Sequence, residues 1–241
     1  MIPAMSRLRP FWLALGFLTT LPVPDPGEVR PGEMKAASAY YPLVGWILGA
    51  LLAAAYWLLQ DLPGGLAGAM LLALWLALTG MLHLDGLLDS ADALLAPRAP
   101  AERLRILSDV HHGSFAFGAG FVFLLLKWQT LASLPGPLPL LLAPVAARFW
   151  LLPILNLFPA ARPEGMGATA RQGRVGPGLV FAAPLAVLAP LPALGAGILV
   201  FLLALWAARR LGGGLSGDVY GALVETGELV FLFICLIRGQ P

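Results

Sequence analysis

Residues 64–92 read GGLAGAMLLALWLALTGMLHLDGLLDSAD, an apolar run that leads directly into three aspartates. The first part, residues 64–84, contains no Asp, Glu, Lys or Arg. About 20 consecutive apolar residues are enough to cross the hydrocarbon core of a bilayer. This stretch therefore predicts a transmembrane helix that ends in an acidic surface.

The rest of the chain has the same apolar character. Of its 241 residues, 59% are hydrophobic and only 12% are charged, and the mean hydropathy is +0.83. A soluble domain carries roughly 25% charged residues, so the surface of this chain must largely face lipid. We predict an all-α, polytopic integral membrane bundle in which residues 1–241 form a single membrane-embedded domain. Cys235 is the only cysteine, which excludes an internal disulfide.

Seven segments are near spanning length: 36–59, 64–84, 114–134, 138–158, 177–190, 193–208 and 218–237. The fifth and sixth are separated by Ala189-Pro190-Leu191-Pro192, which we interpret as the turn of a tight helical hairpin. Residues 11–24 are too short for a span and predict a partly inserted or interfacial helix. The expected fold has about seven spans plus this N-terminal helix.

Predicted loops that contain basic residues alternate along the chain with loops that contain none. Loops 85–113, 159–176 and 209–217 contain arginines, whereas loops 60–63 and 135–139 contain no Lys or Arg. Basic loops lie on the cytoplasmic side of a membrane. We therefore expect a multi-pass protein of the cytoplasmic (inner) membrane, with the acidic surface facing the cytoplasm and the C-terminus outside.

Asp85, Asp89 and Asp92 are spaced i, i+4 and i+7, so they line one face of a helix. Three of the 13 acidic residues of the chain fall within this short stretch. Such clustering is costly in an apolar chain unless a cation lies among the carboxylates. With Asp109 in the following loop, they predict a Mg²⁺ or Mn²⁺ site for a diphosphate. The alternative is a solvated helix end just outside the membrane.

Residues flanking this cluster are more ambiguous. His83 is expected to contact a phosphate, to relay a proton, or only to cap the interface. Gly113 and Ser114 begin the next apolar segment, where free backbone N–H groups would bind an anion, although a serine N-cap gives the same pattern. The adjacent His111 and His112 do not share a helix face, so no zinc site is predicted.

Charged residues at membrane depth supply further candidates. Arg148 is expected to contact a phosphate or carboxylate, with snorkelling as the alternative. The polar loop that begins Arg162-Pro163-Glu164-Gly165 is expected to close over a substrate. In the last segment, Gly217 would let the backbone approach a ligand closely. Asp218, Glu225 and Glu228 are candidate functional acids, with a structural pairing with Arg148 as the alternative.

The chain resembles the cobalamin synthase family, adenosylcobinamide-GDP ribazoletransferase, in four stretches that occur in the same order. They are FLTTLPVP at 17–24, YPLVGWILG at 41–49, HLDGLLDSAD at 83–92 and SGDVYGA at 216–222, the last followed by Glu225 and Glu228. The chain departs from the family pattern at Leu88, Ala93, His111 and Ala116.

The resemblance implies the last assembly step of vitamin B12. α-Ribazole, or its 5′-phosphate, would be joined to adenosylcobinamide-GDP with release of GMP, a phosphoryl transfer that needs positioning and charge neutralisation. The expected cofactor is Mg²⁺, with Mn²⁺ as the alternative. The expected partners are these substrates and the lipid bilayer, without nucleic acid; a homo-oligomer is compatible with the sequence. The predicted site comprises the catalytic residues His83, Asp109, Arg148, Asp218 and Glu225; the substrate-binding residues Gly113, Ser114, Arg162, Glu164, Gly165, Gly217 and Glu228; and the metal ligands Asp85, Asp89 and Asp92.

Two other classes of protein also place acids in membrane helices. A CDP-alcohol phosphotransferase has the signature Asp-x-x-Asp-Gly-x-x-Ala-Arg, whereas here Gly86 follows the first aspartate and no Ala-Arg or second aspartate pair follows at that spacing. A transporter would place its acids near the midplane with repeat symmetry. In this chain the acids crowd one predicted face and no repeat is visible.

Overall fold

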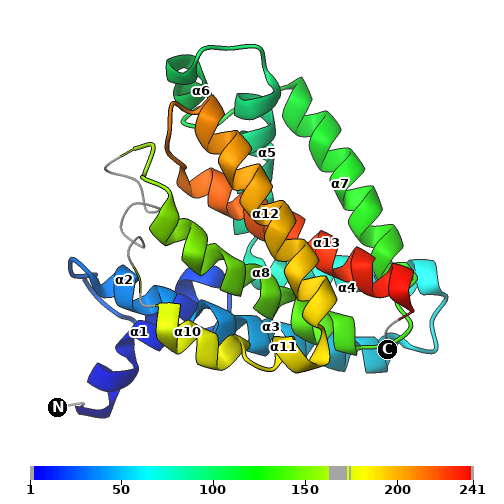
Figure 1. Cartoon of the computed structure of the whole chain (residues 1–241). Helices are drawn as coiled ribbons and strands as arrows, with labels where there is room; N and C mark the ends of the chain where they lie inside the picture. Colours follow the sequence, from blue (N-terminus) through cyan, green and yellow to red (C-terminus); the bar gives the residue numbers. More distant parts are fainter. Residues whose placement is uncertain (1–2, 163–172, 174, 240–241) are drawn as a thin grey trace.

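The computed structural model describes residues 3–162, 173 and 175–239, with side chains from residue 8 onward. In this part of the chain the regular structure is helical, apart from one isolated bridge between Ala160 and Leu215 (Figure 1). The helices are α1 (Pro3–Leu18), α2 (Glu33–Ser38), α3 (Tyr41–Leu59), α4 (Gly64–Thr79), α5 (Leu82–Leu95), α6 (Pro100–Ile106), α7 (Ser114–Ala132), α8 (Leu138–Leu157), α10 (Val175–Ala182), α11 (Leu185–Leu188), α12 (Pro190–Arg210) and α13 (Gly217–Arg238).

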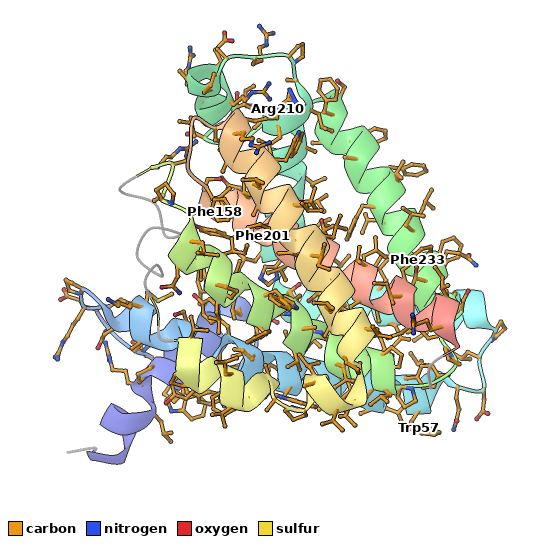
Figure 2. The ribbon with its side chains drawn as sticks, in the orientation of Figure 1. Trp57, Phe158, Phe201, Arg210 and Phe233 are labelled. Atoms are coloured by element: carbon orange, nitrogen blue, oxygen red, sulfur yellow. The ribbon has the colours of Figure 1, made fainter. Side chains whose placement is uncertain are left out.

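Five of these helices are long and apolar enough to cross a membrane: α3, α7, α8, α12 and α13. The pair α4 and α5 makes a sixth if it is one bent span. Large apolar side chains point outward around the bundle, among them Trp57, 57% exposed, and Phe233, 49% exposed (Figure 2). An apolar outer surface requires lipid around it. The predicted polytopic helical membrane bundle is confirmed.

The number of spans differs from the expected seven in the segment 177–208. Here α10 has eight residues and α11 has four, and neither is long enough to cross a bilayer. Pro190 and Pro192, which we interpreted as a hairpin turn, lie instead in the first turn of the single span α12. Proline is tolerated there because the first N–H groups of a helix have no intrahelical partner.

The predicted span 64–84 ends early, at Thr79. Gly80 and Met81 both have positive φ angles, of 58° and 59°, and α5 leaves α4 at 92°. The carbonyl groups that end α4 are satisfied by a distant residue: the Thr20 hydroxyl donates to Ala77 O at 2.8 Å and the Thr20 N–H donates to Leu78 O at 2.8 Å. The N-terminal segment thus supports the bend, and the bend sets the direction of the aspartate-bearing helix α5.

Small residues let α3 and α8 approach closely. A Cβ on Gly45 would lie 2.7 Å from Pro144 O, and a Cβ on Gly49 would meet the backbone carbonyl of Leu141 at a still shorter distance. Small residues at i and i+4 are typical of close packing between membrane helices. This contact fixes α8, which carries Arg148 and part of the candidate site.

We expect Gly49→Ala to destabilise the protein by about 1–3 kcal/mol, because the added methyl group overpacks the α3–α8 contact. Gly118→Ala in α7 is the matched control, since a Cβ there meets nothing within 4 Å. It should be neutral or stabilising by up to about 1 kcal/mol. Thermal unfolding in detergent measures both variants, and equal melting temperatures would contradict the close-packing argument.

Three loops meet at one end of the bundle, the upper end in Figure 1. Leu215 N–H donates to Pro159 O at 2.9 Å, which joins the loop after α8 to the loop after α12. A Cβ on Gly212 would lie 3.6 Å from Pro100 Cβ, so the same loop also lies beside α6. Arg103 of α6 donates to Ala93 O and Leu94 O, each at 2.7 Å, and so caps α5. The loops that contain arginines therefore lie together in space.

Candidate active site

Two glycines bring α5 and α13 into contact. A Cβ on Gly86 would lie 2.6 Å from Asp218 O, and a Cβ on Gly221 would lie 3.1 Å from His83 O. A side chain would clash at Gly86 and would be unusually tight at Gly221, so the two glycines let the helices approach closely. Asp85 and Asp218 are thereby brought together although they lie far apart in the sequence.

A cavity of about 190 Å³ lies at this contact. Its walls come from α1, α3, α5, α8 and α13. Four of the predicted site residues line it: His83, Asp85, Gly217 and Asp218. The structure thus collects predicted residues from two of the quoted motifs around one space.

Asp85 and Asp89 both face His112, which follows α6 in the chain. His112 Nδ1 lies 3.3 Å from Asp89 Oδ1, and His112 Nε2 lies 3.8 Å from Asp85 Oδ1. Asp89 also interacts electrostatically with Asp85, Asp92 and Asp218. Four carboxylates from α5 and α13 therefore belong to one negatively charged region.

Asp92 has a different environment from the other aspartates of α5. It accepts hydrogen bonds from Gly113 N–H and from Ala116 N–H, the latter at 2.9 Å. An anion at a helix N-terminus is stabilised by unpaired N–H groups and by the helix dipole. The anion-binding turn expected at Gly113 and Ser114 does exist, but a carboxylate of the protein occupies it. The predicted substrate contact at these two residues stays a prediction.

Asp109 lies in the loop before α7 and is exposed. Its Oδ1 lies 2.8 Å from His111 Nδ1 and accepts the His111 backbone N–H at 3.1 Å. The His111 side chain, and next its backbone N–H, hold the pKa of Asp109 below its usual value. Asp109 is therefore ionised at neutral pH. Its predicted catalytic role stays a prediction.

Four charged side chains form a cluster deep in the bundle, which we call the buried ion cluster: Lys127, Arg148, Glu225 and Glu228. Lys127 Nζ lies 2.6 Å from Glu225 and 3.0 Å from Glu228, and Arg148 Nη1 lies 2.7 Å from Glu228. None of the four is more than 1% exposed. Two positive and two negative groups balance one another, as buried charges require.

Arg148 is therefore paired within the protein. It donates to Glu228 and, at 3.2 Å, to Pro144 O. This arrangement favours the structural pairing considered above over a direct phosphate contact or snorkelling. Arg148 Nε and Nη2 have no hydrogen-bond partner among the described residues. The roles predicted for Arg148, Glu225 and Glu228 in chemistry or substrate binding stay predictions.

Arg162 is the first residue of the predicted substrate-closing loop, and the structure describes it. It donates to Leu104 O of α6 and interacts electrostatically with Asp218. Arg162 therefore lies between α6 and the acidic region. Glu164 and Gly165, the other candidates of this loop, lie outside the described residues.

The carboxylates have the donor chemistry of a magnesium site. Within the described ranges, no three His, Cys, Asp or Glu side chains converge closely enough to form a metal site by themselves. Mg²⁺ takes few protein ligands, usually one or two carboxylates, and completes its coordination with water and substrate phosphate. Asp85 and Asp89 together meet that requirement. The residues present therefore fit Mg²⁺ bound jointly with a phosphorylated substrate.

The sequence matches the family described as Cobalamin-5-phosphate synthase over residues 10–236. This chain belongs to that family. The adenosylcobinamide-GDP ribazoletransferase of Deinococcus radiodurans is 53% identical over 231 residues, which cover 94% of this chain and 85% of the relative. Those of Desulfitobacterium hafniense and Pseudomonas putida are each 42% identical, over 95% and 92% of this chain and 96% of each relative. No solved structure matches the sequence.

Two residues of this chain that lie in the site region were not predicted as site residues. Lys127 joins the buried ion cluster, and it could have been found as the one lysine in the apolar segment 114–134, because a charge at membrane depth is a functional candidate by default. Tyr41 lines the cavity. Its only signal in the sequence was its place at the start of the YPLVGWILG stretch.

Proposed function

We propose that this chain joins adenosylcobinamide-GDP to α-ribazole, or to α-ribazole 5′-phosphate, in the last assembly step of cobalamin. The observation that carries the proposal is that Asp85 and Asp218, from two separate family motifs, line one cavity together with His83. The substrates are inferred from the relatives, which are named adenosylcobinamide-GDP ribazoletransferase. Residues 1–241 act as one membrane-embedded catalytic domain, since helices from both ends of the chain, α1, α3, α5, α8 and α13, contribute to the cavity.

In the reaction, the ribose 3′-oxygen forms a bond to the phosphorus attached to cobinamide. The bond from this phosphorus to the GMP oxygen breaks, and GMP leaves with the electron pair. The 3′-hydroxyl proton passes to a base near the nucleophile, for which Asp218 and His83 are the candidates that line the cavity. Arg162 interacts electrostatically with Asp218, and its positive charge would stabilise the departing GMP.

We further propose that Asp85 and Asp89 hold Mg²⁺, or Mn²⁺, together with the diphosphate of the substrate. A bound divalent cation neutralises charge on the diphosphate and on the leaving group. Asp92, the third predicted ligand, has two more lone-pair sites beyond its hydrogen bonds to the start of α7. The buried ion cluster positions α13 against α7 and α8, so that Glu225 and Glu228 act through Asp218.

GMP release tests the function. The purified protein, with adenosylcobinamide-GDP, α-ribazole and Mg²⁺, should produce GMP and adenosylcobalamin in equal amounts. Omitting α-ribazole separates transfer from hydrolysis. A transporter would release no GMP under these conditions, and a CDP-alcohol phosphotransferase would require a CDP-linked donor.

We expect the arginine-containing loops to face the cytoplasm. In a Cys235→Ser background, Pro100→Cys should resist a membrane-impermeant thiol reagent in intact cells and react after permeabilisation. Asp61→Cys, in the turn between α3 and α4, should react in intact cells. Both positions are exposed in the structure. Ready labelling of position 100 in intact cells would reverse the orientation.

A further inference from the structure

The cavity beside the acidic region is lined by two buried polar side chains, Tyr41 and His83. Tyr41 is 1% exposed and His83 is 4% exposed. The Tyr41 hydroxyl and His83 Nδ1 have no hydrogen-bond partner among the described residues. A buried polar group without a partner is unfavourable, and both side chains line the cavity. A ligand with polar atoms near the Tyr41 hydroxyl and His83 Nδ1 would satisfy both groups.

Away from Tyr41, His83, Asp85 and Asp218, the walls of the cavity are largely apolar. They include Phe17 and Leu18 from α1 and Leu151 and Leu155 from α8. Phe17 and Tyr41 are stacked, with ring centroids 6.4 Å apart and planes inclined by 26°. Both rings line the cavity, and aromatic side chains favour contact with an aromatic ligand.

The size of the cavity limits the ligand. A dry cavity of roughly 150 Å³ accepts benzene, so a cavity of about 190 Å³ suits a somewhat larger ring system. A corrin ring is far too large to enter. Guanine has polar atoms along most of its edge, whereas the walls away from Asp85 and Asp218 are mainly apolar and would leave the rest of that edge unpaired. A benzimidazole has two fused rings and, once joined to ribose, a single free ring nitrogen.

We propose that this cavity binds the benzimidazole base of the ribazole nucleoside and so selects the nucleophilic substrate. Tyr41 donates to the free ring nitrogen, and His83 Nδ1 pairs with a ribose hydroxyl. Asp85 and Asp218 line the same cavity, so the ribose lies next to the acidic region where the diphosphate binds. The identity of the nucleoside rests on the function proposed above.

Tyr41→Phe tests the polar contact while keeping the aromatic ring at this position. We expect the KM for α-ribazole to rise about tenfold, as for the loss of one buried hydrogen bond, while the KM for adenosylcobinamide-GDP is unchanged. Isothermal titration calorimetry with α-ribazole alone should show the same tenfold loss of affinity. Equal changes in both KM values, or none, would overturn the assignment.

Leu155→Ala tests the shape of the cavity. It should raise kcat/KM for the larger naphthimidazole riboside, relative to α-ribazole, by at least tenfold. Leu152→Ala is the matched control, because Leu152 is also 1% exposed in α8 but does not line the cavity. Its substrate preference should match that of the wild type. The same preference in both variants would contradict the proposal.

Failure of this inference is distinguishable from failure of the proposed function. If the wild type binds α-ribazole and the variants shift that binding, but no GMP is released, the base site stands and the transferase function fails. If GMP is released normally and the variants change nothing specific to the nucleoside, the function stands and the base site is wrong. No calorimetric binding of α-ribazole to the wild type would overturn the base site directly.

Discussion

Asp85→Asn and Asp89→Asn are each expected to lower kcat for GMP release by at least about 100-fold, equivalent to about 2.7 kcal/mol of transition-state stabilisation. Asparagine keeps the size of the side chain but removes the negative charge that Mg²⁺ requires. Both variants should also need more Mg²⁺ to reach half of their maximal rate. The measurement is GMP release as a function of Mg²⁺ concentration.

Asp61→Asn is the matched control, because Asp61 is exposed in the turn between α3 and α4. It should retain wild-type activity and Mg²⁺ dependence. Full activity in EDTA, or in both the Asp85 and the Asp89 variants, would refute the metal site.

Asp92→Asn is expected to lose activity to a similar extent, and the Mg²⁺ dependence separates two causes. A metal ligand would give a higher Mg²⁺ requirement, as for Asp85 and Asp89. A carboxylate that acts only by holding the start of α7, through Gly113 and Ala116, would leave the requirement unchanged while the rate falls.

Lys127→Met is expected to destabilise the protein by about 3–5 kcal/mol, because it leaves Glu225 as a buried charge without its cation. Lys127 Nζ also lies 4.2 Å from the centre of the Trp75 ring, and this cation–π contact is lost as well. The double variant Lys127→Met with Glu225→Gln should recover much of the loss, since it removes both charges. Thermal or denaturant unfolding in detergent gives the values.

Gln129→Met in the same helix is the control for this experiment. Gln129 is exposed and bonds only locally, to Ser133, so its replacement should change stability by less than about 0.5 kcal/mol. If Lys127→Met is as stable as the wild type, or if the double variant is less stable than the single one, the buried ion cluster does not hold the bundle together.

The class of fold could be predicted from residues 64–92 and the composition. A bilayer allows few backbone arrangements, because every N–H and C=O in the hydrocarbon must be satisfied within the protein. Apolar segments of spanning length therefore indicate helices without further information. The aspartate stripe could also be predicted, because the spacing of Asp85, Asp89 and Asp92 is a local property of a helix.

The expected hairpin at residues 189–192 shows where local patterns are ambiguous. Pro190 and Pro192 fit either a turn or the first turn of a helix, since proline lacks only an N–H that both settings leave unpaired. The neighbours decide between them: Ala193 O accepts the indole N–H of Trp150 from α8 at 2.7 Å, which holds the start of α12 against that helix. The sequence pattern does not contain this contact.

The sequence by itself determined a helical membrane protein, its family and a cluster of acids at a helix end, because these follow from composition, periodicity and short motifs. Only the tertiary structure decided which of the charged groups meet. Arg148 and Glu228 are paired across 80 residues, Lys127 and Glu228 across 101, and Thr20 supports the end of α4 from 57 residues away. The same packing turns Asp92 toward the start of α7 and leaves Tyr41 and His83 facing a cavity. A buried polar group takes its partner from whatever the helix packing places beside it, and that choice depends on the whole bundle rather than on neighbouring residues.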